Sequence, residues 1–176
     1  MIVTEGADLA QLQTLVPQEF ADHWQVTLDF LKVLTARWPE ELARLGFMEQ
    51  AERRNILLRA QAEAWKAKPP AAPVLAAGST GSIPATADLL DVIAHLPLGA
   101  VVLPGLDLDL DDESWNMLGE PGTASHPQYG MKKLLTRLRA GRADVALWPG
   151  SELPPARAAR AKILSEALRP AETTGK

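Results

Sequence analysis

The sequence predicts an α/β fold: an N-terminal helical subdomain followed by a partial parallel sheet with flanking helices. Two observations carry this prediction. Apolar residues recur at three- and four-residue spacing through roughly the first 70 residues, which is the period of an amphipathic helix. After residue 73, two short apolar runs enclose one helical stripe, which is the pattern of a β-α-β unit.

The N-terminal part is expected to form two long helices. The first extends from Pro17 to Trp38 with one buried stripe, and a short helical run from Pro39 to Gly46 follows it. The second spans roughly Met48 to Lys68. The first stripe contains Phe20, Trp24, Leu28, Leu31, Leu34 and Trp38, and the buried face of the second contains Ile56, Leu57, Ala60, Ala64 and Trp65.

The α/β portion is expected to begin with strands at Val74–Ala77 and Ala100–Leu103. These strands should be parallel, because the helix that starts near Pro84 connects them. Its apolar stripe contains Leu89, Leu90, Ile93 and Leu96.

A third strand is expected at Asp144–Trp148, after a helix from about Gln128 to Arg139. Pro154 and Pro155 open a last helix that ends near Leu168. The resulting domain boundaries are a helical subdomain at 1–68, a Pro-rich linker at 69–73, the α/β portion at 74–169 and a frayed tail at 170–176.

Composition restricts the class of protein. Hydrophobic residues make up 47% and charged residues 23%, which is typical of a globular chain. Cysteine is absent, so neither a disulfide nor a thiolate site is possible. The net charge of −4 argues against strong DNA binding by the isolated chain. No apolar stretch or basic N-terminal region suggests a membrane span or signal peptide, so a cytoplasmic location is expected.

One loop has the place of a phosphate-binding loop. Gly78-Ser79-Thr80-Gly81-Ser82 lies between an expected strand and a helix N-terminus, where backbone N–H groups often bind phosphate. The lysine and hydroxyl of a Walker A loop are missing, because Ser82-Ile83-Pro84 follows the last glycine. A turn that uses glycine and serine for steric reasons is therefore the favoured interpretation, and no cofactor is expected.

Metal and catalytic sites are not expected. The acidic run Asp107, Asp109, Asp111, Asp112 and Glu113 lacks the glycine and final carboxylate of a calcium loop, so a solvated loop is favoured. The three histidines, His23, His95 and His126, have no metal-ligand spacing. His126 alone lies in a loop that invites a functional reading, and a structural role is favoured there too.

A basic patch has two interpretations. It comprises Lys132, Lys133, Arg137, Arg139 and Arg142. The first three could contact a DNA backbone. The favoured alternative is the solvated face of a helix whose Met131, Leu134, Leu135 and Leu138 point inward.

Several long segments resemble one protein family. They are DHWQVTLDFLKVLTARWP, AERRNILL, PVLAAGSTGSIPATADLLDVIAHLPLGAVVLPGLDLDLDDESW, HPQYGMKKLL and LSEALRPAETT. In this order and spacing they are similar to the alphaproteobacterial type of the AddB family, subunits of a complex that repairs DNA double-strand breaks. Members of that family are far longer, so the resemblance implies an internal segment.

The resemblance implies a degenerate superfamily 1 helicase-like fold, partnered by an AddA-like helicase-nuclease subunit and by DNA within the complex. An active motor would carry an Asp-Glu pair after the first strand, where this chain has Gly78-Ser79. It would also carry a glutamine after the second strand, where this chain runs Pro104-Gly105-Leu106-Asp107. The resemblance therefore implies a scaffold without ATP hydrolysis.

Two alternatives stay open: a stand-alone small binding or regulatory protein, and a nucleotide-binding domain that uses the Gly78–Ser82 loop. Because a sheet without its neighbouring strands has open edges, a homo-oligomer of the isolated segment is also a candidate.

Overall fold

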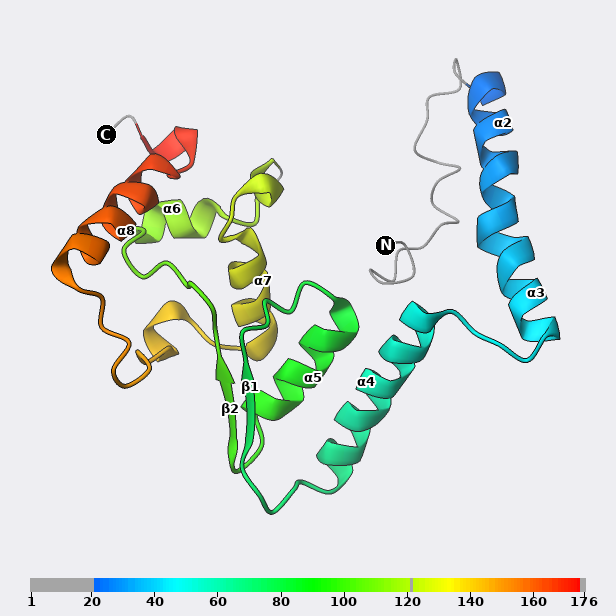
Figure 1. Ribbon diagram of the computed structural model, residues 1–176. Helices are drawn as coiled ribbons and strands as arrows, with labels where there is room; N and C mark the ends of the chain where they lie inside the picture. Colours follow the sequence, from blue (N-terminus) through cyan, green and yellow to red (C-terminus); the bar gives the residue numbers. More distant parts are fainter. Residues whose placement is uncertain (1–20, 121, 175–176) are drawn as a thin grey trace.

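The computed structural model describes residues 21–120 and 122–174. Phe20 and the side chains of Trp24, Leu28 and Leu34 lie outside this description. In Figure 1, α2 and α3 lie at one end of the molecule, α6 and α8 lie at the other, and the strands lie between them. The elements are α2 (Ala21–Lys32), η3 (Val33–Arg37), α3 (Trp38–Arg44), α4 (Gln50–Ala67), β1 (Val74–Ala77), α5 (Pro84–Ala94), β2 (Gly99–Val102), α6 (Asp112–Met117), η4 (Thr123–Ser125), α7 (Tyr129–Leu138), η5 (Arg142–Asp144), α8 (Pro155–Ala167) and η6 (Ala171–Thr173).

The two strands pair in parallel, which confirms the β-α-β prediction. Val74 lies opposite Gly99, and Ala77 lies opposite Val102. The glycine at the start of β2 has a packing reason, because a Cβ there would lie 1.8 Å from the carbonyl oxygen of Ile93. Only glycine lets the chain turn this tightly from the end of α5 into β2.

Helix α5 is the centre of the core. One cluster joins α5 to α4 through Ala62, Val92, Ile93 and Leu96. A second joins α5 to α7 through Ala87, Leu90, Leu134 and Leu138. Leu90, Ile93 and Leu96 are buried, as the apolar stripe of this helix predicts, and Leu89 is half-buried. The first cluster contains residues from both sides of the expected linker at 69–73, because Ala62 packs with Val92 and Ile93. The division into two domains stays a prediction.

The predicted buried face of α4 is confirmed only at Trp65, which is half-buried and packs against the core, and is wrong at Ile56, Leu57, Ala60 and Ala64. Ile56 is 46% exposed and Leu57 is 55% exposed, whereas Asn55 and Ala62 are buried. The packed face follows the spacing 51, 55, 58, 62 and 65, which forms one stripe on a helix. The small side chain of Ala62 lets α4 approach α5 closely, so this face is preferred although more apolar residues lie elsewhere on the helix.

In the predicted buried stripe of the N-terminal helix, only Leu31 and Trp38 have described side chains, and the prediction is wrong at Trp38. Trp38 is 47% exposed, and its indole N–H donates to Glu49 Oε1 at 2.6 Å. Leu31 is half-buried. Val26 and Phe30 are 72% and 67% exposed, so this helix presents apolar side chains to solvent. The short helix at Trp38–Arg44 confirms the helical run predicted to end at Gly46, which has φ +75°.

The third strand predicted at 144–148 is absent from the structure. Arg142–Asp144 forms a 3₁₀ turn, and residues 145–148 have no regular structure. The Asp144 carboxylate accepts the Gly141 N–H at 2.8 Å, which closes the turn where a strand would need to extend. The last helix, Pro155–Ala167, agrees with its prediction.

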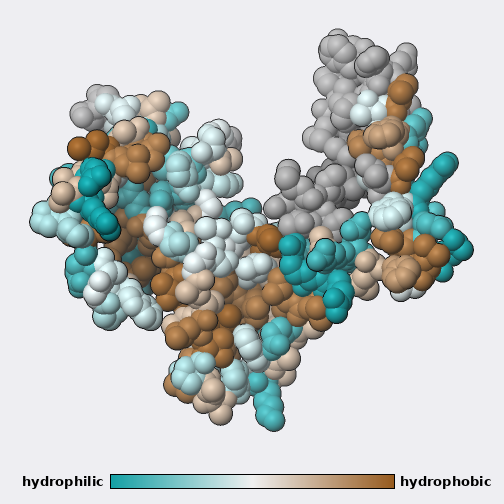
Figure 2. Space-filling view, in the orientation of Figure 1, coloured by the Kyte–Doolittle hydropathy of each residue, from teal (hydrophilic) through white to brown (hydrophobic). Residues whose placement is uncertain are grey.

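Within the part of the chain that the structure describes, only one face of β1 packs into the core, and β2 is half-buried along its length. Val74 and Ala76 of β1 pack toward α5 in the two core clusters. Leu75, which alternates to the opposite face, is 63% exposed. Among residues 21–120 and 122–174, β1 and β2 pair only with each other, so both outer edges are open. Figure 2 shows apolar side chains gathered over the sheet and the adjoining helices.

Of the helices in the described ranges, none combines the length and apolar character that crossing a membrane would require.

Candidate functional site

The carboxyl ends of β1 and β2 lead into the two loops singled out in the sequence. In open α/β sheets this edge is where ligands usually bind. The first loop, Gly78–Ser82, connects β1 to α5. The second, residues 103–111, connects β2 to α6 and holds the first part of the acidic run.

The glycines of the first loop have structural reasons. Gly78 and Gly81 adopt φ values of +76° and +61°, which disfavour other residues. A Cβ on Gly81 would also lie 2.8 Å from Leu134 Cδ1 on α7. The Gly81 N–H donates to Ser79 Oγ at 3.3 Å, and α5 opens with Pro84, which has no N–H. The Gly81 N–H is thus engaged within the loop and Pro84 provides no donor, and phosphate binding by this loop stays a prediction.

The second loop is fixed by its own carboxylate and by one glutamine. Asp107 Oδ1 accepts the N–H groups of Asp109 and Leu110 at 2.9 and 3.0 Å. Gln128, just before α7, accepts the Asp107 N–H at 3.1 Å and donates to the Gly105 carbonyl at 2.9 Å. The carboxylate that follows β2 is therefore occupied in shaping its own turn.

Asp111 caps α6 and ties it to the C-terminal helix. Its carboxylate accepts the Ser114 N–H at 2.8 Å and the Ser114 hydroxyl at 2.9 Å, and it pairs with Arg169. The Ser114 N–H, together with the Ser114 hydroxyl and the Arg169 charge, holds the pKa of Asp111 below its ordinary value. The Ser114 hydroxyl also lies 2.8 Å from that of Thr173, and both side chains are buried.

The remaining acidic residues do not form a metal site. Asp112 pairs with Arg142 at 2.6 Å although its side chain is 94% exposed. No group of three or more potential ligands that could hold a metal ion occurs within residues 21–120 and 122–174. The acidic run therefore forms hydrogen bonds and ion pairs that fix its loop, in addition to its exposure to solvent.

The predicted DNA-contacting residues have different surroundings. Lys132 Nζ donates to the carbonyls of Trp115 and Asn116 at 2.8 and 2.7 Å, at the C-terminal end of α6. Burial lowers the pKa of Lys132, as expected for an ammonium group held against protein. Arg137 pairs with Asp88 on α5, and Lys133 is exposed. Lys132 and Arg137 thus bind other groups of the chain, and DNA contact by the three cations stays a prediction.

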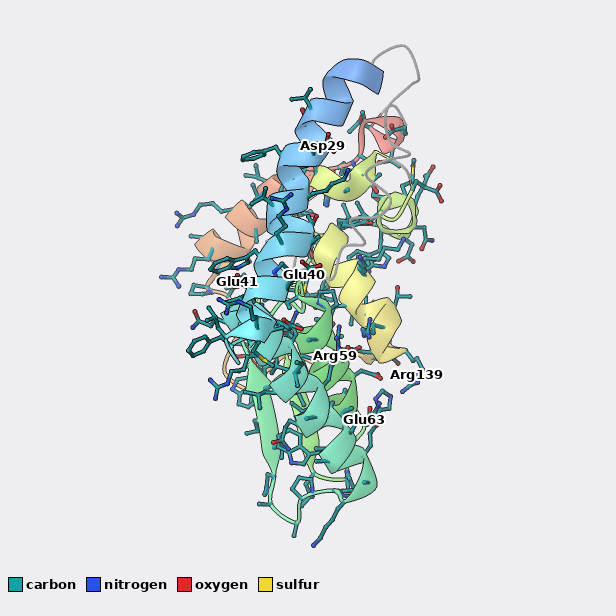
Figure 3. The ribbon with its side chains drawn as sticks, turned by 90° about the vertical axis from the view of Figure 1, so that its right-hand side faces the viewer. Asp29, Glu40, Glu41, Arg59, Glu63 and Arg139 are labelled. Atoms are coloured by element: carbon teal, nitrogen blue, oxygen red, sulfur yellow. The ribbon has the colours of Figure 1, made fainter. Side chains whose placement is uncertain are left out.

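The other cations of the patch are also paired. Arg139 lies 3.4 Å from Asp91 and 3.2 Å from His95 Nε2. Arg142 is bound by the acidic loop described above. Figure 3 shows Arg139 at the end of α7 and Arg59 on α4, and α5 packs against both of these helices. Arg59 lies 3.7 Å from Asp88, so the carboxylates of α5 neutralise cations from both of its neighbours.

The two described histidine side chains contact backbone groups. His126 Nε2 lies 2.7 Å from the Leu168 carbonyl, and its Nδ1 accepts the Gln128 N–H at 3.1 Å. His95 Nδ1 lies 2.7 Å from the Asp91 carbonyl. The His126 ring thus links its loop to the end of α8, and the His95 ring contacts the preceding turn of α5. Both contacts agree with the structural role favoured from the sequence. The side chain of His23 lies outside the described part of the chain.

Sequence reasoning missed two sets of arginines. Arg169 joins Asp111 to Glu166, and Asp111 lies 58 residues away along the chain, so no local pattern in the sequence indicates this pair. Arg53 and Arg54 line a surface groove between α4 and α5 with leucines beside them. Their adjacency in a helix was visible in the sequence, but the groove requires the packing of α4 on α5.

Chemically, the residues at this edge of the sheet form ion pairs and side-chain hydrogen bonds that fix loops and helix ends around a small apolar core. Comparisons with protein-family models, with curated proteins and with solved structures each found no match to this chain.

Proposed function

We propose that this chain is a non-catalytic scaffold segment of an AddB-like subunit, within a helicase-nuclease complex that resects DNA double-strand breaks for recombination. The sheet is proposed to be part of a degenerate helicase-like fold. The AddA-like helicase-nuclease subunit is its proposed partner, and DNA is bound in the context of the complex.

The observation that supports this proposal is the uncovered sheet. Parallel sheets are almost always covered on both faces, and two-stranded sheets are marginal by themselves. Here Leu75 is 63% exposed on the uncovered face, and both strand edges are open in the described part of the chain. A surface of this kind is expected of a segment that completes its fold against other protein.

The carboxyl edge of the sheet supports the non-catalytic part. β1 leads into Gly78-Ser79 without a carboxylate. After β2, Asp107 is the first carboxylate, and it accepts two N–H groups of its own loop. A motor needs a carboxylate that can hold magnesium and orient water, and the hydrogen bonds of Asp107 compete with that task.

Co-expression with the AddA-like subunit tests the proposal. We expect the two chains to elute as one complex from a size-exclusion column with light-scattering detection. Leu75→Asp should abolish this complex, because it places a charge on the uncovered face. Leu147→Asp is the matched control, since Leu147 is 64% exposed but lies in the loop before α8.

Three results would contradict the proposal. The wild-type chains could elute separately, which would favour a stand-alone binding or regulatory protein. Both variants could bind equally well, which would remove the sheet face from the interface. ATP turnover by the chain itself, lost on Ser79→Ala or Thr80→Ala, would favour the nucleotide-binding alternative.

A further inference from the structure

A groove of about 580 Å³ runs between the N-terminal half of α4 and α5. Its apolar lining comes from Ala51, Leu57 and Leu58 of α4 and from Leu89 of α5. Leu57 is 55% exposed, so much of its side chain faces solvent. Apolar side chains that line a concave surface are a frequent feature of sites that receive a helix from another protein.

The rim of this groove is cationic. Arg53 and Arg54 line it together with Gln50 and Gln61, and no acidic residue lines it. Both arginines are exposed, and within the described residues neither forms an ion pair with a carboxylate. Arg54 makes a hydrogen bond of 3.4 Å to Asn55 Oδ1. The rim therefore carries two positive charges on a chain whose net charge is −4.

A second groove, of about 280 Å³, provides a contrast. It lies at the other end of α4, and its charged lining residues include Lys66, Asp91 and Arg139. Here Lys66 pairs with Glu63 at 2.8 Å and Arg139 lies 3.4 Å from Asp91. The cations of the second groove are already neutralised, whereas those of the first have no carboxylate partner among residues 21–120 and 122–174. Charge complementarity thus indicates that the first groove, rather than the second, is suited to bind an acidic partner.

The leucines decide the class of partner. A nucleic-acid backbone would pair with the arginines but would leave the exposed leucine surface in water. A helix with leucines on one face and carboxylates beside them would bury that surface and pair both arginines. Each buried apolar side chain adds to binding in proportion to the area removed from water.

We propose that the α4–α5 groove is a docking site for an acidic amphipathic helix of a partner protein. The leucines of that helix enter the groove, and its carboxylates pair with Arg53 and Arg54. This site goes beyond the proposed scaffold function and does not depend on the AddB resemblance, because the groove is distinct from the uncovered face of the sheet.

Two fluorescein-labelled model peptides of about four helical turns test the proposal by fluorescence anisotropy with the full chain. Both have the same leucine stripe, and one carries glutamates where the other carries lysines. We expect the glutamate peptide to bind at least about tenfold more tightly than the lysine peptide. Its binding should weaken as salt concentration rises, because exposed charges contribute.

Variants locate the site. Arg53→Glu combined with Arg54→Glu should weaken binding of the glutamate peptide at least about tenfold, and Leu57→Ser should weaken it by a similar factor. Arg157→Glu with Arg160→Glu makes the same charge change on exposed positions of α8 and should leave it within about twofold. Equal loss in this control, or binding of both peptides alike, would overturn the proposal. An unchanged affinity in the groove variants would also overturn the proposal.

This test is separate from that of the scaffold function. If only the complex with the AddA-like subunit failed to form, the scaffold function would be contradicted and the proposed docking site would not.

Discussion

The guanidinium carbon of Arg142 lies 4.8 Å from the centre of the Trp115 ring. The same side chain donates to the carbonyls of Asp107 and Leu110 and pairs with Asp112. It is only 12% exposed. A single arginine after α7 therefore holds the acidic loop and the first turns of α6 together.

Replacing Arg142 with methionine should lower the free energy of unfolding by about 2 kcal/mol, because charged hydrogen bonds and a cation–π contact are lost together. Urea unfolding followed by tryptophan fluorescence measures the change. The control is Arg160→Met on α8, where the side chain is exposed, and we expect a change within about 0.5 kcal/mol. Equal losses of unfolding free energy in the two variants would contradict a stabilising role for the Arg142 contacts.

Lys132 and Lys133 are adjacent in the sequence, but their substitutions are expected to affect stability differently. Lys132→Met removes two charged hydrogen bonds to the end of α6 and should cost about 1–2 kcal/mol of stability. Lys133→Met, at an exposed position, should change stability by less than about 0.5 kcal/mol. Chemical denaturation of both variants tests the difference. If Lys132 served DNA alone, its substitution would leave stability unchanged and weaken DNA binding.

Gly81 and Gly150 separate backbone strain from packing. Both have positive φ, at +61° and +78°, so alanine should cost about 1–2 kcal/mol at either position. At Gly81 the new Cβ also meets Leu134, whereas nothing lies within 4 Å at Gly150. Gly81→Ala should therefore lower the free energy of unfolding more than Gly150→Ala, by an additional amount of about 1 kcal/mol or more. The unfolding midpoint of Gly81→Ala should be correspondingly lower. Equal midpoints would show that the loop does not pack on α7.

Asp111 should give the protein a specific sensitivity to acid. The folded state lowers its pKa, chiefly through the Ser114 N–H, so ionised Asp111 stabilises the fold. That stability is complete above the unfolded pKa of about 3.9 and is lost as pH falls through the lower folded value. We expect the unfolding free energy to decrease below about pH 4, and to decrease less steeply in Asp111→Asn. An Asp111→Asn variant that loses stability with acid as steeply as the wild-type chain would contradict this expectation.

The elements that the sequence predicted well are those whose contacts are local and whose apolar residues lie on one side. In the β-α-β unit, Leu90, Ile93 and Leu96 fall on the buried stripe, and the short runs on either side pair in parallel. Helix α4 was harder, because apolar residues occur all around it. Its buried face is selected by the fit of Ala62 against α5, and a sequence does not reveal that fit.

The surroundings of the charged residues were the least predictable. Lys132, Arg137 and Arg142 read as a basic patch, yet each reaches a partner between 16 and 49 residues away along the chain. Such pairs depend on how α5, α6 and α7 are placed, and composition records only that acids and bases are both present. The strand expected at 144–148 does not form, because residues 142–144 close a turn through the Asp144 carboxylate and the Gly141 N–H instead of extending along an open edge of the sheet.

The packing of α5 has a consequence for the order of folding. Helix α5 contacts α4, β1 and β2, which are its immediate neighbours along the chain. Loop closure between such neighbours is entropically inexpensive, so residues 50–102 can collapse while the ribosome is still synthesising the rest. We expect helix α7 then to dock on this preformed unit, and α8 to be added last through the polar contacts of Arg169. We expect hydrogen exchange to be slowest in α5 and fastest in α8, so that the chain loses its C-terminal helix long before it loses its core.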